Sequence, residues 1–191
     1  MAGQEGRTHI AVAAELAPPI HAEQTIMKKP TKQPRRGRDR KPLPTLRALS
    51  LDECDDLLQR NQVGRLAFTF HDRVDIEPVH YVYADGWLHG RTSPGTKVAT
   101  LLHHPWVAFE VDEVQGLFDW RSVVVHGVVD IPDADGSPAD KAAFTGTLAL
   151  IRELVPEALE ADDPTPLRQV LFRIHVDEVT GRASSTPRLT P

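Results

Sequence analysis

The dipeptide Asp85-Gly86 constrains the fold of this chain more than any other short segment. It lies between two runs rich in β-branched and aromatic residues, 78–83 (PVHYVY) and 87–91 (WLHGR). Asp-Gly between such runs is a strong hairpin signal, because both residues of the tight turn need a positive φ. The chain is therefore expected to contain an antiparallel hairpin at this point.

A two-residue loop also fixes the register of the hairpin. Three cross-strand pairs follow from it: Ala84 with Trp87, Val82 with His89, and His80 with Arg91. Since side chains alternate along a strand, His80, His89 and Arg91 are expected on one face.

Other segments indicate further strands and a few helices. Strands are predicted at 64–70, 74–79, 107–112, 120–131 and 171–177, and helices at 51–59, from Ser93 onward and from Ser137 to Leu154. Strands outnumber helices and alternate apolar with polar residues, which favours an antiparallel barrel with peripheral helices over a parallel α/β sheet.

Residues 91–97 (RTSPGTK) place two cations and three hydroxyls at a predicted helix start. Ser93 is a favourable N-cap, and Pro94 suits the first helical position. Free N–H groups and the helix dipole attract an anion there, and Arg91 and Lys97 add full positive charges. The segment predicts a phosphate site. The alternative is an ordinary strand-to-helix turn with an exposed lysine.

The predicted strand at 120–131 carries a second candidate group. Trp120, Ser122 and His126 fall on one of its faces. An aromatic and a hydroxyl on one face can line a planar ligand, although Trp120 can equally well cap a barrel core.

Seven segments occur in a characteristic order: 51–54 (LDEC), 63–68 (VGRLAF), 77–81 (EPVHY), 91–97 (RTSPGTK), 107–112 (VAFEVD), 120–127 (WRSVVVHG) and 179–182 (VTGR). Together they resemble the pyridoxamine 5′-phosphate oxidase-like FMN-binding split-barrel family, and within it the branch that includes nitroimidazole-resistance proteins. The resemblance spans residues 46–183.

The resemblance implies a mainly β fold, a six-stranded antiparallel split β-barrel with peripheral helices. It also implies a homodimer with one FMN at each of two sites in the subunit interface, so that both subunits build each site. The implied cofactor-binding residues are Pro78, Val79, His80, Tyr81, Arg91, Thr92, Ser93, Thr96, Lys97, Trp120 and Ser122. His80 is the candidate acid or base beside the flavin, the alternative being an inert histidine of the barrel wall.

The chain departs from the family pattern in places that bear on its substrate. Relatives often carry Asn where His80 stands and Gly where Asp119 stands, and residues 162–166 (DDPTP) replace a Pro-Trp-Ala-Pro-Gly-like loop. Segments like the Trp-Gly-Gly-Tyr and Arg-Leu-His-Asp-Arg of true pyridoxamine phosphate oxidases are absent, which argues against vitamin B6 oxidation.

The expected function is an FMN-dependent oxidoreductase that passes electrons from a reduced nicotinamide to a small electrophile such as a nitroaromatic or a quinone. Two alternatives remain. The histidines can serve a haem-binding or deazaflavin-dependent split-barrel protein, or the chain can be a non-catalytic flavin-binding sensory module.

Charge divides the chain into a basic arm and an acidic domain. Residues 1–42 hold nine Lys and Arg against four Asp and Glu, and the remainder holds thirteen against twenty-three. We expect a disordered arm at 1–42, a split-barrel domain at 43–185 and a tail at 186–191. The arm has no aromatic or periodic pattern, so a solvated tail is favoured over a nucleic-acid contact.

Several other classes of site lack their sequence signals. A single cysteine, Cys54, excludes an internal disulfide and a thiolate zinc cage, and it is expected to be a small core residue. The histidines lack metal-ligand spacing, so no metal site is predicted. The apolar run at 10–16 is short and carries Glu15, which argues against a signal peptide or membrane span, and a cytoplasmic protein is expected.

Overall fold

The computed structural model describes residues 43–186. The predicted basic arm, and the tail after Thr186, lie outside the described residues, so the three-part division of the chain stays a prediction. No helix in the described range combines the length and the apolarity needed to cross a bilayer.

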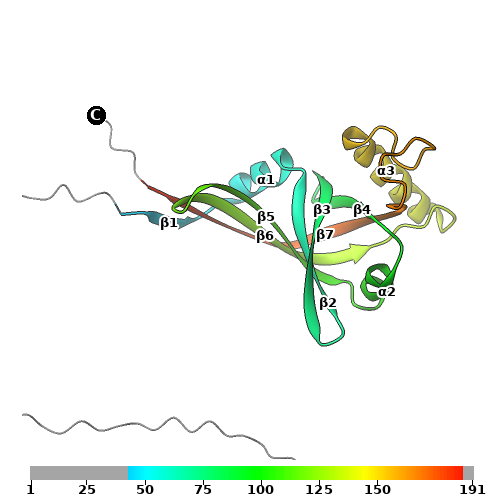
Figure 1. Ribbon diagram of the computed structural model, residues 1–191, viewed down its shortest axis with the longest axis horizontal. Helices are drawn as coiled ribbons and strands as arrows, with labels where there is room; N and C mark the ends of the chain where they lie inside the picture. The colour runs from blue at the N-terminus through cyan, green and yellow to red at the C-terminus, as the bar shows by residue number, and fades with distance from the viewer. Residues whose placement is uncertain (1–42, 187–191) are drawn as a thin grey trace, which may run out of the picture. The chain divides into compact units, whose positions relative to one another are not determined.

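The described strands form one antiparallel sheet that closes on itself (Figure 1). The strands are β1 (Thr45–Ala48), β2 (Val63–Phe70), β3 (Arg73–Ala84), β4 (Trp87–Thr92), β5 (Trp106–Gly116), β6 (Asp119–Asp130) and β7 (Val170–Ser185). Their order is β1-β7-β4-β3-β2-β5-β6, and β6 also pairs with β7. Strands β2 to β7 therefore close the ring, which confirms the predicted six-stranded split barrel, and β1 is added at the edge of β7.

Three helices lie on this sheet: α1 (Leu51–Arg60), α2 (Thr96–His103) and α3 (Pro138–Leu154). Helix α1 begins with a capping box, in which Ser50 Oγ accepts the Glu53 N–H at 3.2 Å and the Glu53 carboxylate accepts the Ser50 N–H at 2.9 Å. Helix α3 begins with a second capping box at Ser137. Both helix starts were predicted from the sequence.

The core fills the barrel interior beneath α1. Leu57 and Leu58 of α1 are fully buried, and they meet inward-facing residues of the strands. Burying one such side chain stabilises the fold by about 1.5–3 kcal/mol. A smaller cluster of Ile151, Ala158 and Leu171 holds α3 against the sheet.

The predicted hairpin forms with its predicted turn. Asp85 and Gly86 have φ values of 50° and 76°, as a tight turn with two left-handed residues requires. Ala84 pairs with Trp87, and Val82 pairs with His89. The ladder ends at Tyr81–Gly90, one step before the predicted His80–Arg91 pair.

Strand β7 is much longer than predicted, because it continues past Asp177 to Ser185. It follows β6 through a register shift at His126–Gly127 and then pairs with β1. Gly127 permits the close approach, since a Cβ there would lie 1.9 Å from the carbonyl oxygen of His175. The exposed strand β1 was not predicted.

Candidate functional site

A hollow of about 310 Å³ lies between β3, β4 and the start of α2. We call it the α2 hollow. Its lining residues are Glu77, Pro78, Val79, Arg91, Thr92, Ser93, Pro94, Gly95, Thr96, Lys97 and Arg168. The structure thus brings seven of the predicted cofactor-binding residues together around one space: Pro78, Val79, Arg91, Thr92, Ser93, Thr96 and Lys97.

The start of helix α2 differs from its prediction. The N-cap is Gly95, not Ser93, and no side chain caps the first turn. Thr92 still pairs with Val170 in the sheet, so the chain needs further residues before it can turn into a helix. Gly95 has a φ of 153°, which side-chain-bearing residues rarely adopt. The first-turn N–H groups of α2 therefore lie at the hollow without a side-chain cap or an acidic neighbour on that turn.

Lys97 lies in the hollow but already has a partner. Its Nζ donates to Glu77 Oε2 at 2.5 Å. The lysine side chain is 15% exposed and the glutamate side chain 44% exposed, so the pair faces the hollow and remains accessible to solvent on the glutamate side.

Arg91 is buried and makes a two-pronged ion pair with Asp163. Its Nη1 and Nη2 donate to the Asp163 carboxylate at 2.5 Å and 3.0 Å, and Nη2 also donates to Thr165 Oγ1 at 2.7 Å. The guanidinium holds the pKa of Asp163 well below its usual range. Much of the hydrogen-bonding capacity of Arg91 is thus used within the protein.

Arg168 is a lining residue that the sequence reasoning missed. Asp163 and Thr165, which reach Arg91 from the segment before β7, were missed as well. The segment DDPTP was noticed as a departure from relatives, and Asp followed by Pro and Thr is a turn signal that points to its backbone role. No local signal marks Arg168 as a neighbour of residues 91–97.

His80 lies on β3 beside the charged groups of the hollow. Burial, then the charges of Arg168 and Arg91, lower the pKa of its imidazole. The ring is therefore neutral around pH 7, and it can accept a proton or a hydrogen bond. His80 itself does not line the hollow, and neither does His89, which is buried with its Nδ1 3.0 Å from Thr147 Oγ1 of α3.

Tyr81 was predicted to contact the cofactor, but its side chain points into the core. It is 1% exposed, and its hydroxyl donates to the Leu58 carbonyl at 2.7 Å. Strand alternation explains this orientation, since His80 and Tyr81 must face opposite sides of β3, and the predicted cofactor contact of Tyr81 stays a prediction. A ligand can reach Tyr81 only through its backbone.

Trp120 and Ser122 lie outside the α2 hollow of the same chain. Trp120 lines a different hollow with Arg60 and Glu113, and Ser122 Oγ donates to Glu110 Oε1 at 2.7 Å. One copy of the chain does not bring them to residues 91–97, so their predicted role requires a second subunit and stays a prediction.

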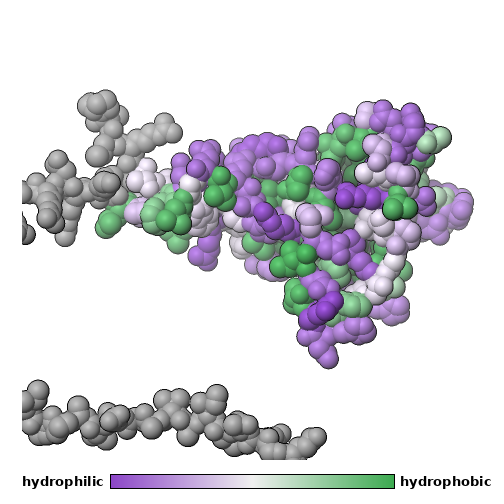
Figure 2. Space-filling model, in the orientation of Figure 1, coloured by the Kyte–Doolittle hydropathy of each residue, from purple (hydrophilic) through white to green (hydrophobic). Residues whose placement is uncertain are grey.

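The outer surface of the sheet carries an exposed apolar face. Ile76, Ala67 and Ala108 are paired neighbours across β3, β2 and β5. Val74 and Trp106 lie on the same side, 65% and 69% exposed. We call these five residues the outer apolar face. In Figure 2, hydrophobic side chains gather on the visible surface over the lower part of β2 and β3.

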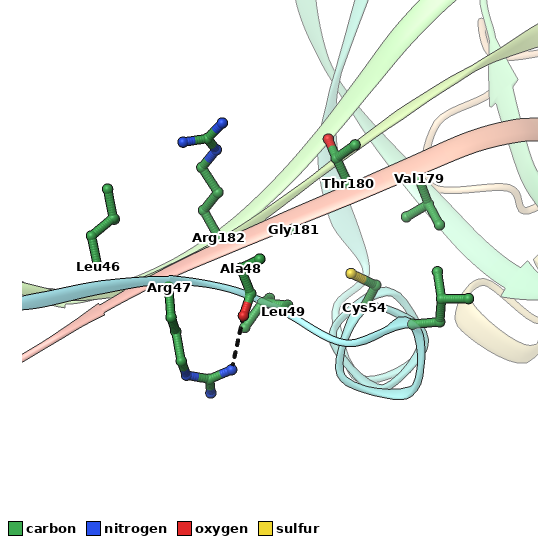
Figure 3. A pocket seen from close by; sticks show the side chains of 10 residues that line it. Leu46, Arg47, Ala48, Leu49, Cys54, Val179, Thr180, Gly181 and Arg182 are labelled. Atoms are coloured by element: carbon green, nitrogen blue, oxygen red, sulfur yellow. Dashed lines mark hydrogen bonds between the residues drawn. The ribbon is translucent and has the colours of Figure 1, made fainter.

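A further hollow of about 460 Å³ lies between β1, α1 and β7 (Figure 3). Cys54 borders it and is 1% exposed, which confirms that the cysteine is a core residue. Burial and the neighbouring acidic side chains raise the pKa of its thiol, so the reactive thiolate is disfavoured. No predicted site residue lines this hollow.

The sequence of this chain is similar to that of a known protein family. Residues 50–183 match the family model described as pyridoxamine 5′-phosphate oxidase. A curated but uncharacterised protein of Rhizobium meliloti (strain 1021) is 26% identical over 153 residues, which cover 75% of this chain and 99% of that protein.

Two solved structures illustrate the likeness in three dimensions. An FAD-binding protein from Mesorhizobium loti is 29% identical with a TM-score of 0.59, over 73% of this chain and 98% of that one. A Bacteroides thetaiotaomicron protein named for 5-nitroimidazole antibiotic resistance is 14% identical with a TM-score of 0.56, over 75% of this chain and 90% of that one. The second likeness concerns the fold alone.

Proposed function

The chain belongs to the pyridoxamine 5′-phosphate oxidase family, and on that premise we propose that it is a flavoprotein that binds the phosphate of FMN in the α2 hollow. The observation that carries the proposal is the bare N-terminus of α2, which lies in the same hollow as three cationic side chains. Open N–H groups, a helix dipole and nearby cations are the usual surroundings of a bound phosphate.

The residues present fit such a group. Gly95 leaves the backbone accessible, since nothing lies within 4 Å of the place where a Cβ would stand. Ser93 and Thr96 are exposed at the hollow and carry hydroxyls that can donate to phosphate oxygens. Lys97 can turn from Glu77 toward an anion, because Glu77 is partly exposed and can be solvated instead.

We further propose that the complete site forms between two copies of the chain. The α2 hollow is at the lower end of the volumes that hold small ligands, so a flavin ring must extend beyond it. The outer apolar face offers a surface for a second copy, and a symmetric contact is self-complementary by construction. The second copy would supply Trp120 and Ser122 to close the ring pocket.

A test of this arrangement is the variant Trp106→Glu, which places a charge on the outer apolar face. We expect a monomer in light-scattering measurements and a loss of flavin together. The matched control Leu102→Glu changes a similarly exposed apolar residue, on α2 and outside that face. A monomeric variant that keeps its flavin would refute the two-copy site.

The proposed activity is the transfer of electrons from a reduced nicotinamide to a small electrophile such as a nitroaromatic or a quinone. A bound flavin supplies the hydride and electron chemistry. The chain's own contributions are to bind the phosphate at α2, to hold the ring against β3, and to present the neutral imidazole of His80 as a proton acceptor.

The experiment that tests the proposal is the absorption spectrum of the freshly purified protein, together with the mass of any chromophore released on denaturation. FMN or FAD would support a flavoprotein, and the mass would decide between them. A haem Soret band or a deazaflavin mass would replace the flavin proposal. Turnover with reduced nicotinamide and a quinone would then separate an enzyme from a flavin-binding sensor.

A further inference from the structure

The three cations of the α2 hollow differ in what they are bonded to. Arg91 is paired with Asp163, and Lys97 is paired with Glu77. Arg168 forms no ion pair with any residue in the range 43–186, although it lines the same hollow and is partly buried. Two of the three positive charges are thus offset within the protein, and that of Arg168 is not.

A buried carboxylate anchors the segment that carries Arg168. Asp163 accepts the backbone N–H groups of Leu159 at 2.9 Å and Thr165 at 2.8 Å, besides the guanidinium of Arg91. Thr165 in turn accepts the backbone N–H of Arg168 at 3.0 Å. A chain of bonds therefore leads from Arg91 on β4 to the backbone of Arg168.

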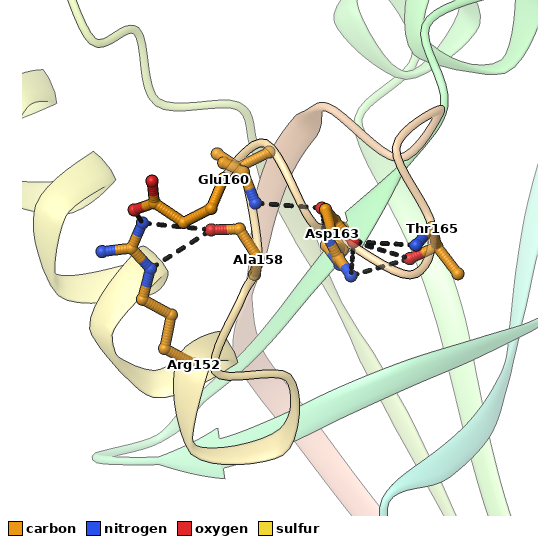
Figure 4. A network of polar contacts seen from close by, with 7 residues as sticks. Arg152, Ala158, Glu160, Asp163 and Thr165 are labelled. Atoms are coloured by element: carbon orange, nitrogen blue, oxygen red, sulfur yellow. Dashed lines mark hydrogen bonds and ion pairs between the residues drawn. The ribbon is translucent and has the colours of Figure 1, made fainter.

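The backbone at Leu159, just before this segment, adopts an unfavourable conformation that its neighbours must stabilise. Leu159 has a φ of 62°, a conformation that costs a side-chain-bearing residue about 1–3 kcal/mol unless its surroundings impose it. Its N–H donates to the buried Asp163 carboxylate at 2.9 Å, a contact that helps to hold this conformation. Arg152 of α3 holds the same segment through the Ala158 carbonyl at 3.1 Å (Figure 4).

From these contacts we propose that Arg168 is the residue that pairs with the flavin phosphate, and that Asp163 is a positioning residue that holds Arg168 at the hollow through Arg91 and Thr165. This inference rests on the proposed function and names the charge that selects a phosphorylated flavin. The same charge reaches His80, whose pKa it lowers after the larger effect of burial. The main role of Arg91 is to pair with Asp163 within the protein, and any contact with the ligand is secondary.

The test compares three ligands on the full chain: FMN, FAD and riboflavin, which lacks a phosphate. Apo protein is titrated with each, and the dissociation constant is measured by flavin fluorescence for the wild type and for Arg168→Ala. We expect the variant to bind the tightest phosphorylated flavin about tenfold or more weakly, since charge-assisted hydrogen bonds contribute strongly. Riboflavin affinity should not change.

The control is Lys141→Ala, which removes an exposed cation of α3 that does not line the hollow. It should bind all three ligands as the wild type does. An Arg168→Ala variant that binds FMN and FAD normally, or that loses riboflavin equally, would overturn the inference while the flavoprotein proposal stands. A wild type that binds no flavin would overturn the proposed function instead.

A second readout needs no flavin. The titration of His80 is followed by nuclear magnetic resonance, with and without inorganic phosphate. Arg168→Ala should raise the pKa of His80, because a neighbouring positive charge is removed. Added phosphate should raise the His80 pKa in the wild type and have little effect in the variant. Equal titrations in the two proteins would contradict an uncompensated Arg168 charge beside His80 and would overturn the inference.

Discussion

Residues 91–97 and residues 163–168 meet at the same hollow, but their charged side chains serve different purposes. The first segment holds the conspicuous motif, yet both of its cations are engaged by carboxylates of the same chain. The second segment has no recognisable motif, and it delivers Arg168, which pairs with no described carboxylate. A charge inside a binding motif can therefore belong to the framework, while a charge outside it remains available to a ligand.

The largest expected effect comes from breaking the framework pair. Arg91→Ala leaves the Asp163 carboxylate buried without its partner, which is among the costliest single changes in a protein. We expect Tm to fall by about 10 °C or more in differential scanning calorimetry. Lys97→Ala is the control, because its partner Glu77 is partly exposed, and Tm should then fall by about 3 °C at most. An equal fall in Tm for the two variants would contradict the claim that Arg91 stabilises the fold more than Lys97 does.

A pair of glycine variants probes the start of α2. Gly95→Ala forces a side chain into a backbone conformation near φ 153°, which should lower the free energy of unfolding by about 1–3 kcal/mol and weaken flavin binding. Gly146→Ala, in the middle of α3 with open space around it, should raise the free energy by about 0.5–1 kcal/mol. Urea titration measures both. A neutral Gly95→Ala would remove the argument for a backbone-built site.

The side of β3 that faces the core can be tested separately from the side that faces the hollow. Tyr81→Phe removes the hydroxyl that donates to Leu58, so we expect a loss of about 1 kcal/mol in urea titrations. Flavin affinity should not change, because the tyrosine side chain points away from the hollow. A variant that keeps its stability and loses flavin would place Tyr81 at the ligand instead.

The smallest expected effect is a difference in pH dependence between two histidines. Burial lowers the pKa of both His89 and His80, so the unfolded chain takes up protons first as the pH falls. The free energy of unfolding should therefore decrease as the pH drops below about 6.5. His89→Gln should reduce this decrease more than His80→Gln, because His89 is the more deeply buried. Urea titrations between pH 5 and 8 measure the slopes, and a larger effect at His80 would contradict the expectation.

Local signals were sufficient for much of the fold. The turn at Asp85-Gly86 and the helix starts after Ser50 and Ser137 were predicted because each depends on residues within a few positions of one another. The last strand was predicted to end at Asp177, whereas β7 continues to Ser185. The strand continues to Ser185 because its later residues pair with β6 and β1. These partners lie far away in the sequence, so the residues of β7 alone do not predict the pairing.

The residues of the candidate site likewise fall into those that local sequence predicts and those that only the fold brings together. The segment 91–97 was predicted to be a phosphate site from its own residues, and the structure gathers it around a hollow. The helix start was misplaced by two residues because the end of β4 is held in the sheet by Val170, far along the chain. Asp163 and Arg168 were missed because their proximity to Arg91 arises from the barrel closing through β4 and β7.

The most direct test of the account is the affinity of the wild-type apo protein for FMN and for riboflavin, measured side by side in the same buffer. A phosphate held at the α2 hollow predicts that FMN binds about a hundredfold more tightly than riboflavin, with the difference shrinking as salt is added. Equal affinities, or a preference for riboflavin, would contradict the claim that this hollow is a phosphate site.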